Sequence, residues 1–599
     1  MKPNKQRNVY FWFIFHLTYM TCLENVFYTE SDFDFQSVIF KDNFNAFYWG
    51  YSHRHGKKVI INTFPYRVFK VVDLFYFLCS IDAYLRIESQ YLLPIIGVSF
   101  KGDLMVIYYE AEETEIINWE KVSNNNYMDI LMSISLGIEH LHENLIPHYR
   151  IKPDSVFKVN NSYKIGMIRP PTFLNLEESD YEFITLNTTG EQYDSFSFGL
   201  LVGSLISGKK PQDIMKEFWE FKDIDFGDSP LGLVTKRCLS LSPKQRPSFS
   251  EILAMMMINP KEDNVFPNGN HSEKIDRLNT SGVFSFLETR SKNGCLLSSL
   301  IIGTMYSSGE VVMKSLENAR KCLEMCIEKG EAIAMNNLAK ILYSEDKEKS
   351  MNLLIDSANK GYAIAHINYG KILAKPIDRK DNSPDTLKKW FLVASHYHKA
   401  ADQGSVEGMC YYANIIQFRD MEEHFRYLRK AARRGDTLAI HMTGLCYEKG
   451  KGVEENREIM LKYFNYGAGL NSPISMNNIG TNTPDIDQSI SLWKKAAESG
   501  VKHSQYNLGI SHIRGRGVPQ DFEEAFKWML KSAEQHFYPA CFNVALMYRD
   551  GIGTEKNEEK AEEWCRIGNN EWLALTSKGQ LYEERRKIAK LTMIENQED

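Results

Sequence analysis

The sequence lacks the features that mark several classes of protein. It contains no pair of cysteines with the C-x-x-C spacing, and its ten cysteines are scattered over 599 residues. We therefore expect no metal site, no redox centre and no disulfide scaffold, and free thiols in a reducing compartment. The formal net charge is −6, and neither half of the chain has a basic excess. A nucleic-acid-binding domain is therefore not expected.

Long apolar runs are also missing, because no stretch reaches the roughly 20 apolar residues that span a bilayer. The one marked run, Val9–Phe15, follows three basic residues, which is the charge order of a signal peptide. However, it is aromatic rather than leucine-rich, and no small-x-small cleavage site follows. We expect a cytoplasmic protein without membrane contact, in which residues 1–30 form a packed extension. The alternative is a signal or anchor within residues 1–25 and a location in the endoplasmic reticulum or secretory pathway.

The region 31–258 has the pattern of an α+β domain. Up to about Tyr109, apolar runs such as VFKVVDLFYFL, LLPIIGVSF and DLMVIYY predict a mostly β part. Apolar residues at helical spacing then predict helices near 124–144, 196–206 and 249–257. A β-rich part followed by a helical part is an α+β arrangement. Residues 259–295 are polar and rich in Asn, Pro, Gly and Ser, which predicts a linker.

From residue 296 to about 572 the sequence repeats itself, and residues 573–599 form a charged tail. Each unit is a helix with small residues, a turn that contains glycine, a second helix ending in Ala-Ala, and a closing glycine. About eight such units are present. Because one helix pair cannot bury its apolar face alone, the units are expected to stack into an all-α solenoid.

The repeat signature has a physical explanation. Paired alanines let neighbouring helices approach closely, and each closing glycine takes the left-handed backbone conformation that strains other residues. The signature residues are Ala431, Ala432, Ala496 and Ala497, the closing Gly404, Gly435 and Gly500, and the turn residues Gly515 and Gly517. This pattern resembles Sel1-like repeats, which are relatives of tetratricopeptide repeats. The resemblance implies a superhelical surface that binds other proteins.

Three ordered segments in the first region resemble the C-terminal half of a protein kinase domain, closest to the tyrosine-kinase-like branch. They are IPHYRIKPDSVF from Ile146, DSFSFGLLVGSLISGKKP from Asp194 and RCLSLSPKQRPSFSEIL from Arg237. The resemblance implies a bilobal fold for residues 31–258. It also implies that Asp194 holds the catalytic-loop backbone and that Arg246 makes an ion pair that anchors the activation segment. The further retained positions of the kinase fold are His148, Pro153 and Gly199.

Phosphoryl transfer requires charged groups and glycines around Mg-ATP. Their positions are degenerate in the β-rich part of this region. The alignment places Phe40, Asp42 and Asn45 at the three glycines of the phosphate-binding loop, and Asn62 at the phosphate-binding lysine. The glutamate partner of that lysine has no counterpart. The nearest candidates for it are Asp73, Ser80 and Asp82.

The catalytic loop is degenerate as well. Arg150 replaces the general-base aspartate, and a guanidinium cannot accept a proton from a substrate hydroxyl. Ser155 occupies the metal-binding asparagine position, and Met167 occupies the metal-chelating aspartate position, where a thioether is a poor ligand for Mg²⁺. Lys152 of the loop is retained.

The sequence therefore favours a protein without enzymatic activity or a cofactor. The hypothesis is a pseudokinase joined to a Sel1-like solenoid, acting as a scaffold or adaptor in intracellular signalling. One alternative is an atypical Ser/Thr-type kinase in which Lys57 or Lys58 replaces the lysine and Asp154 replaces the base. Another is nucleotide binding without metal or catalysis, and a third is a Sel1-type adaptor of the endoplasmic reticulum. Whether the two regions touch is left open.

Overall fold

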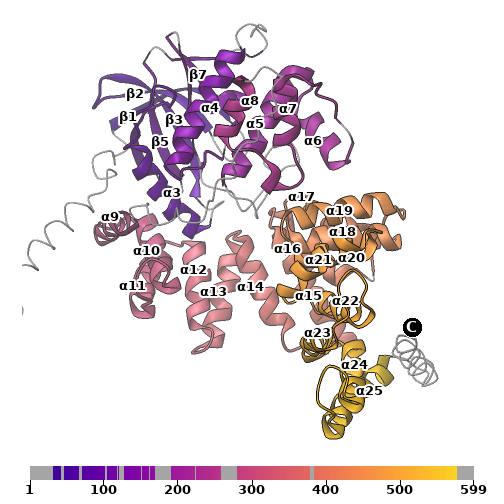
Figure 1. Cartoon of the computed structure of the whole chain (residues 1–599). Coiled ribbons are helices and arrows are strands. Elements are labelled where there is room, and N and C mark those ends of the chain that lie inside the picture. The colour runs from indigo at the N-terminus through magenta and orange to yellow at the C-terminus, as the bar shows by residue number, and fades with distance from the viewer. Residues whose placement is uncertain are drawn as a thin grey trace, which may run out of the picture. The chain divides into compact units, whose positions relative to one another are not determined.

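The computed structural model describes residues 32–575, apart from 42–45, 67–69, 102–103, 113, 118, 120–126, 150, 161, 167, 169–189, 223, 258–279, 378–382 and 418. The chain forms two compact units, Met1–Asp436 and Thr437–Asp599 (Figure 1).

The first unit begins with a five-stranded antiparallel sheet. Its strands are β1 (Phe33–Lys41), β2 (Ala46–Ser52), β3 (Lys57–Pro65), β4 (Ile95–Lys101) and β5 (Leu104–Glu110), in the order β1-β2-β3-β5-β4. Side chains alternate between the two faces of a strand. Ile60 and Phe64 of β3 accordingly join the main core of the unit, whereas Val59 and Ile61 join a smaller cluster on the other face. Strand β3 is thus buried on both faces.

Helix α3 (Val71–Tyr84) connects β3 to β4, and it is apolar on all sides. None of its 14 residues is exposed. The prediction of a strand for the run VVDLFYFL is wrong, because β-branched and aromatic residues favour strands only where the surroundings suit a strand. Burial on every side stabilises this helix despite that preference.

Helices and a small second sheet complete the N-terminal region. The helices are α4 (Tyr127–Glu143), α5 (Gly190–Ser207), α6 (Pro211–Trp219), α7 (Pro230–Cys238) and α8 (Phe249–Met257). The second sheet contains β6 (Thr114–Ile116), β7 (Val156–Val159) and β8 (Ser162–Ile165), and short 3-10 turns lie at η4 (Pro153–Ser155) and η5 (Pro243–Gln245). The kinase-like bilobal arrangement of these elements stays a prediction.

The all-α solenoid predicted from residue 296 is confirmed as an array of helix pairs. The first unit holds α10 (Leu296–Ser308), α11 (Leu316–Glu328), α12 (Ala332–Leu342), α13 (Lys347–Asn359), α14 (Ala363–Ala374), α15 (Pro384–Asp402), α16 (Val406–Ile416) and α17 (Met421–Arg433). The second unit holds α18 (Thr437–Lys449), α19 (Arg457–Gly469), α20 (Pro473–Asn482), α21 (Ile486–Glu498), α22 (Lys502–Arg514), α23 (Phe522–Glu534), α24 (Tyr538–Asp550) and α25 (Glu558–Leu575).

The predicted linker, residues 259–295, is wrong over its last part. Residues Thr280–Lys292 form helix α9, which buries Val283, Phe284, Phe286 and Leu287. The abundance of Asn, Pro, Gly and Ser in the preceding residues concealed this short apolar motif. The division between the compact units also falls at residue 436, inside the repeats, because α9 and the first repeats share a core with the N-terminal region. Within the described part of the chain, no helix is both long and apolar enough to span a membrane.

Candidate functional site

Asn62 lies at the middle of β3, at the position where the kinase resemblance expects a lysine. Its neighbours in the sheet are Phe47 on β2 and Ile107 on β5. The side chain is fully buried, and neither its amide nitrogen nor its amide oxygen has a hydrogen-bond partner among the described residues. A neutral amide at this place cannot provide the charge that a lysine offers to a phosphate.

The two lysines at the start of β3 contact residues other than Asn62. Lys57 alternates to the opposite face from Asn62, and its ammonium lies 2.6 Å from a carboxylate oxygen of Glu110 and 3.3 Å from one of Glu112. These hydrogen bonds, that to Glu110 above all, raise the pKa of Lys57. The ammonium of Lys58 lies over the ring of Trp49, 3.7 Å from its centroid. Neither lysine is bonded to the Asn62 amide.

The three polar candidates on α3 also make contacts of their own. Asp73 lies in the first turn of the helix, where burial raises the pKa of its carboxyl group. The hydroxyl of Ser80 donates to the carbonyl oxygen of Tyr76 at 3.0 Å. The buried carboxylate of Asp82 pairs with the guanidinium of Arg86, one turn further along the chain. None of these side chains bonds to Asn62.

Asp194 organises the loop that precedes η4. Its fully buried carboxylate accepts hydrogen bonds from the backbone N–H of His148 at 2.6 Å and of Tyr149 at 2.8 Å. A ring nitrogen of His142 lies 2.9 Å from the same carboxylate. Tyr149 has a backbone φ of 56°, in the left-handed region that costs free energy for a residue with a side chain. Two hydrogen bonds to a buried carboxylate therefore hold a strained segment of the loop.

Ser155 and its neighbours close the same loop. The buried hydroxyl of Ser155 donates to the carbonyl oxygen of Lys152 at 2.7 Å and accepts from its N–H at 3.1 Å. Trp119 donates its ring N–H to the carbonyl oxygen of Pro153 at 2.9 Å. A ring nitrogen of His148 lies 2.7 Å from the carbonyl oxygen of Gly166. The hydroxyl of Ser155 thus serves the loop backbone.

Several predicted positions fall outside the described residues. These are Asp42, Asn45, Arg150, Met167 and the side chain of Phe40. The structure therefore brings Asp194 together with His148 and Tyr149 of the loop, and it places Asn62 separately, in the middle strand of the sheet.

Gly199 and Arg246 lie in the helical part of the region. A Cβ atom on Gly199 would lie 2.5 Å from the Cβ of Cys238, so α5 and α7 approach closely only because this residue is glycine. Arg246 donates to the carbonyl oxygens of Ser240 at 3.0 Å and Gln192 at 3.3 Å. The ion pair that the resemblance implies for Arg246 stays a prediction.

The repeat signature residues occupy the ends and the interior of the helix pairs. The closing Gly404, Gly435 and Gly500 have φ values of 84°, 76° and 92°, all in the left-handed region. The turn residues behave alike, with 61° at Gly515 and 74° at Gly517. The paired alanines are at most 2% exposed at Ala431, Ala432, Ala496 and Ala497.

Sequence reasoning missed a row of asparagines on the first helices of the pairs. The amide of Asn337 donates to the hydroxyl of Thr304 on α10 at 3.1 Å, and that of Asn368 donates to Asn336 on α12 at 2.8 Å. In the second unit Asn478 lies 3.1 Å from a ring nitrogen of His441 on α18. Each asparagine therefore joins its own first helix to the first helix of the preceding pair. The signal was an asparagine two residues before a small residue in the first helices α12, α14, α20, α22 and α24.

Comparison with protein families matches the family described as Sel1 repeat, at residues 394–405, 408–436, 437–472, 479–501, 502–537 and 539–568. The Sel1 repeats predicted for the C-terminal region are therefore confirmed. Sel1 repeat proteins generally bind other proteins.

Among curated proteins, DAP3-binding cell death enhancer 1 of Mus musculus is 26% identical over 156 residues, which are 24% of this chain and 29% of that protein. Wee1-like protein kinase of Oryza sativa subsp. japonica is 25% identical over 141 residues, 21% of this chain and 27% of that protein. The matches span only 29–34% of the length of the curated relatives found first. A solved Sel1 repeat protein from Oxalobacter formigenes is 23% identical, with a TM-score of 0.37, and the match covers 56% of this chain and 99% of that one.

Proposed function

We propose that this chain, with Sel1 repeats in its C-terminal region, is an intracellular scaffold or adaptor whose N-terminal region is a catalytically inactive, kinase-like domain. The observation that carries the inactive assignment is Asn62. A fully buried, neutral amide occupies the middle strand at the position of the expected lysine. The similarity to a Wee1-like protein kinase supports a kinase-like ancestry for part of the chain.

The contacts of the loop support the same proposal. Asp194 binds the loop backbone with geometry suited to a structural anchor, whereas Ser155 uses its hydroxyl within the loop. The anchor of the loop is thus present, and the hydroxyl expected near the metal is engaged elsewhere. The atypical-kinase alternative requires Lys57 or Lys58 to replace the missing lysine. Their contacts with Glu110 and Trp49 argue against that substitution.

Nucleotide binding and phosphotransfer by the full chain test the inactive assignment. We expect no change in the thermal unfolding temperature with ATP, either with Mg²⁺ or with a chelator, and no transfer of labelled phosphate to a generic substrate. Phosphotransfer that survives purification and disappears in Lys152→Ala would overturn the proposal. A thermal shift with ATP that is equal with Mg²⁺ and with chelator would identify nucleotide binding without catalysis.

The adaptor role is assigned to the surface formed by the first helices of the pairs. These helices contact one another between neighbouring pairs, as α10 does with α12 and α14 with α16, so they form the inner side of the array. Lys340 of α12 is exposed there, near Lys371 of α14, whose ammonium pairs with a carboxylate oxygen of Glu407 at 2.6 Å. A protein partner with acidic groups could pair with the ammonium of Lys340.

Charge reversal tests this surface. We expect Lys340→Glu to abolish capture of a partner that the wild-type chain captures, whereas Lys349→Glu, an exposed residue on the second helix α13, leaves capture intact. Equal capture by both variants would exclude the inner surface around Lys340. Localising the full chain beside residues 26–599 tests the intracellular setting.

A further inference from the structure

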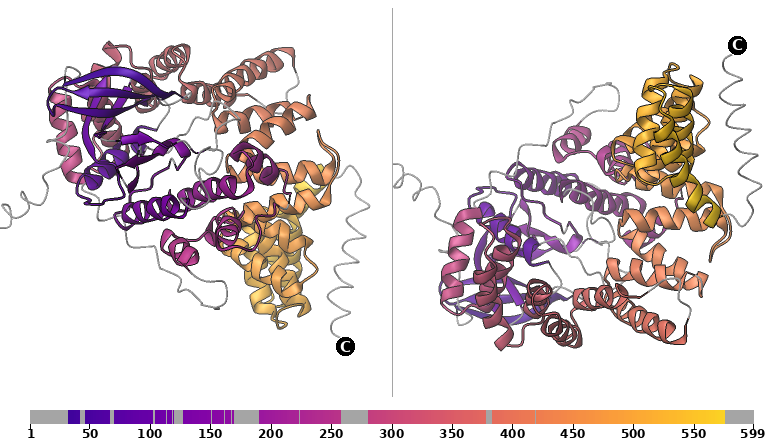
Figure 2. Two further views of the ribbon diagram at one scale, coloured as in Figure 1. Left: turned by 90° about the horizontal axis from the view of Figure 1, so that it is seen from above. Right: turned by 90° about the horizontal axis from the view of Figure 1, so that it is seen from below.

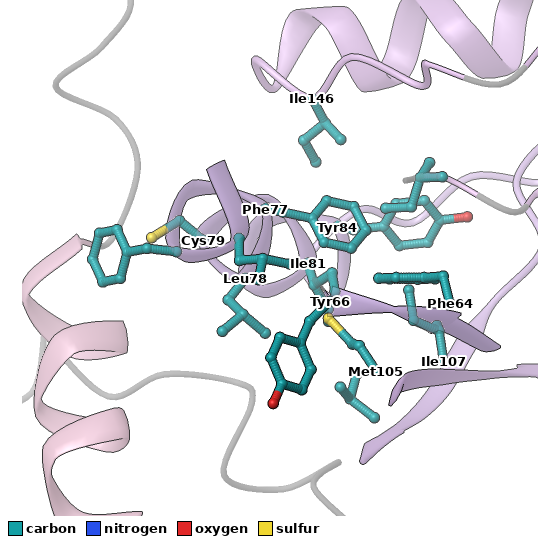
Figure 3. Packing of buried hydrophobic residues seen from close by; sticks show 14 of the residues in the cluster. Phe64, Tyr66, Phe77, Leu78, Cys79, Ile81, Tyr84, Met105, Ile107 and Ile146 are labelled. Carbon is teal, nitrogen blue, oxygen red and sulfur yellow. The ribbon is translucent and has the colours of Figure 1, made fainter. Parts of the chain in front are cut away.

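Helix α3 is covered on both sides, but the sheet covers only one of them. It packs against α9 and α10, which come from the far side of the predicted linker. Figure 3 shows Cys79 on the side of α3 that is turned away from Phe64 and Ile107 of the sheet. Both views of Figure 2 show the pink helix α9 beside the indigo elements of the N-terminal region.

The surface that faces α3 is apolar. Phe284 and Leu287 of α9 and Leu300 and Ile301 of α10 belong to the same hydrophobic cluster as Leu74, Phe75 and Leu78 of α3. Burial of apolar surface stabilises the folded chain, and losing the cover would expose the apolar side of α3 to water.

The first helix of the array differs from five later first helices at one position. An asparagine stands two residues before a glycine or alanine in five first helices, as Asn337, Asn368, Asn478, Asn507 and Asn543. In α10 the corresponding residue, two before Gly303, is Ile301, and it is fully buried. The corresponding residues of α16 and α18 are Tyr411 and Met442, so the asparagine is not present in every later repeat. In α10, which follows no earlier repeat and contacts α3, the position is apolar.

A buried hydrogen bond joins the same two parts. The hydroxyl of Tyr66, directly after β3, donates to a carboxylate oxygen of Glu331 at 2.6 Å, across 265 residues of sequence. Both residues are at most 8% exposed. The other carboxylate oxygen of Glu331 accepts from the N–H of Ile333 at 3.3 Å and caps α12. The carboxylate therefore ties the start of α12 to the end of β3.

We propose that α9, α10 and the Glu331 cap act as a clamp that binds the outer side of helix α3 within the chain. Occupied in this way, α3 is not available to a partner molecule. Because α3 contacts α9 and α10, a displacement of the first repeats would act on α3. This inference holds whether or not the N-terminal region binds a nucleotide.

Hydrogen exchange of the full chain, followed by mass spectrometry, tests the clamp. Ile301→Asn introduces the residue that other repeats carry at this position, so the helix pair tolerates it while the contact with α3 does not. We expect exchange of the α3 amides to accelerate at least tenfold, approximately, with the strands β3 and β5 unchanged. Asn507→Ile, at the equivalent position of α22, is the matched control and leaves α3 unchanged.

Tyr66→Phe provides a milder second variant, which removes one hydroxyl and no packing. It is expected to accelerate exchange of α3 by about tenfold, as the loss of one hydrogen bond to a charged group implies. If Ile301→Asn lowers protection throughout the first unit, it does not distinguish the clamp from general destabilisation, and the exchange of α3 in Tyr66→Phe then decides between them. Wild-type protection of α3 in Tyr66→Phe, or loss of α3 protection only together with β3 and β5, would overturn the clamp.

Discussion

Replacement of Asn62 by leucine is expected to stabilise the first unit. Its amide nitrogen and amide oxygen are both buried without a partner in the described structure, whereas both would bond to water in the unfolded chain. Leaving one buried polar group unsatisfied costs about 1–3 kcal/mol. Leucine has a similar size, carries no polar atom and matches its neighbours Phe47 and Ile107.

The magnitude follows from three contributions. Removing the unsatisfied amide contributes about 2 kcal/mol, and burying the apolar leucine side chain contributes about 2 kcal/mol more. Imperfect fit of a branched side chain in a packed sheet opposes this by about 1–2 kcal/mol. We therefore expect a net stabilisation of roughly 2 kcal/mol, which is a factor of about 30 in an opening equilibrium.

Hydrogen exchange of the β3 amides in the full chain measures this change locally, which avoids assuming two-state unfolding of a large protein. The matched control is Asn336→Leu. Asn336 is equally buried, but its oxygen accepts from Asn368 at 2.8 Å and its nitrogen donates to Asn337 at 3.1 Å. That variant should lose about 1–3 kcal/mol. Faster exchange in Asn62→Leu would refute the reasoning, since it would mean that the amide is satisfied in solution.

Three further outcomes are expected. Asp194→Ala should destabilise the loop by about 3 kcal/mol, because two backbone N–H groups lose a buried charged acceptor, with faster exchange over residues 146–155 as the readout. Gly553→Ala should unfold the last helix pair and make it sensitive to limited proteolysis, because the added Cβ would overlap a neighbouring carbonyl oxygen at a residue whose φ is 65°. Gly500→Ala, where the added Cβ would lie in open space, should cost only about 1–2 kcal/mol of stability. Burial lowers the pKa of His366 to about 4, below its unfolded value, so its contribution to stability should fall by about 2–3 kcal/mol as the pH drops from 6.5 to 4. Thermal unfolding of His366→Phe should show a weaker dependence on pH, and what remains includes the neighbouring His396, whose pKa burial also lowers.

The helix pairs were predictable because their signals are local. A closing glycine and the alanines before it lie within one turn of the helix end that they define, and Gly404 and Gly435 take the same left-handed backbone conformation in successive repeats. The identity of Asn62 is equally plain in the sequence. That both atoms of its amide lack a partner is not, because the result depends on which side chains the neighbouring strands and α3 bring near it.

The predictions of a linker at residues 259–295 and of a strand at the residues of α3 were wrong for a common reason. The run VVDLFYFLCSIDAY is apolar on every side of a helix, and such a helix must be buried on every side. The sheet covers only one side, so a second cover was required, and the short motif around Phe284 provides it. Considered together, an apolar helix at α3 requires a second apolar segment to cover it, and the motif around Phe284 is such a segment. Considered separately, the first resembles a strand and the second a polar linker.

Ile301 also distinguishes the first repeat, which packs on the N-terminal region, from repeats that carry asparagine at this position. In α12, α14 and α20 the asparagine bonds to the preceding first helix, as Asn368 does to Asn336. Where the first helix of the array meets α3, an asparagine would be buried against apolar side chains without a partner, at a cost of about 1–3 kcal/mol. We therefore expect an apolar residue at this position of the first repeat to favour packing of the array on the N-terminal region, and a polar one to weaken that packing.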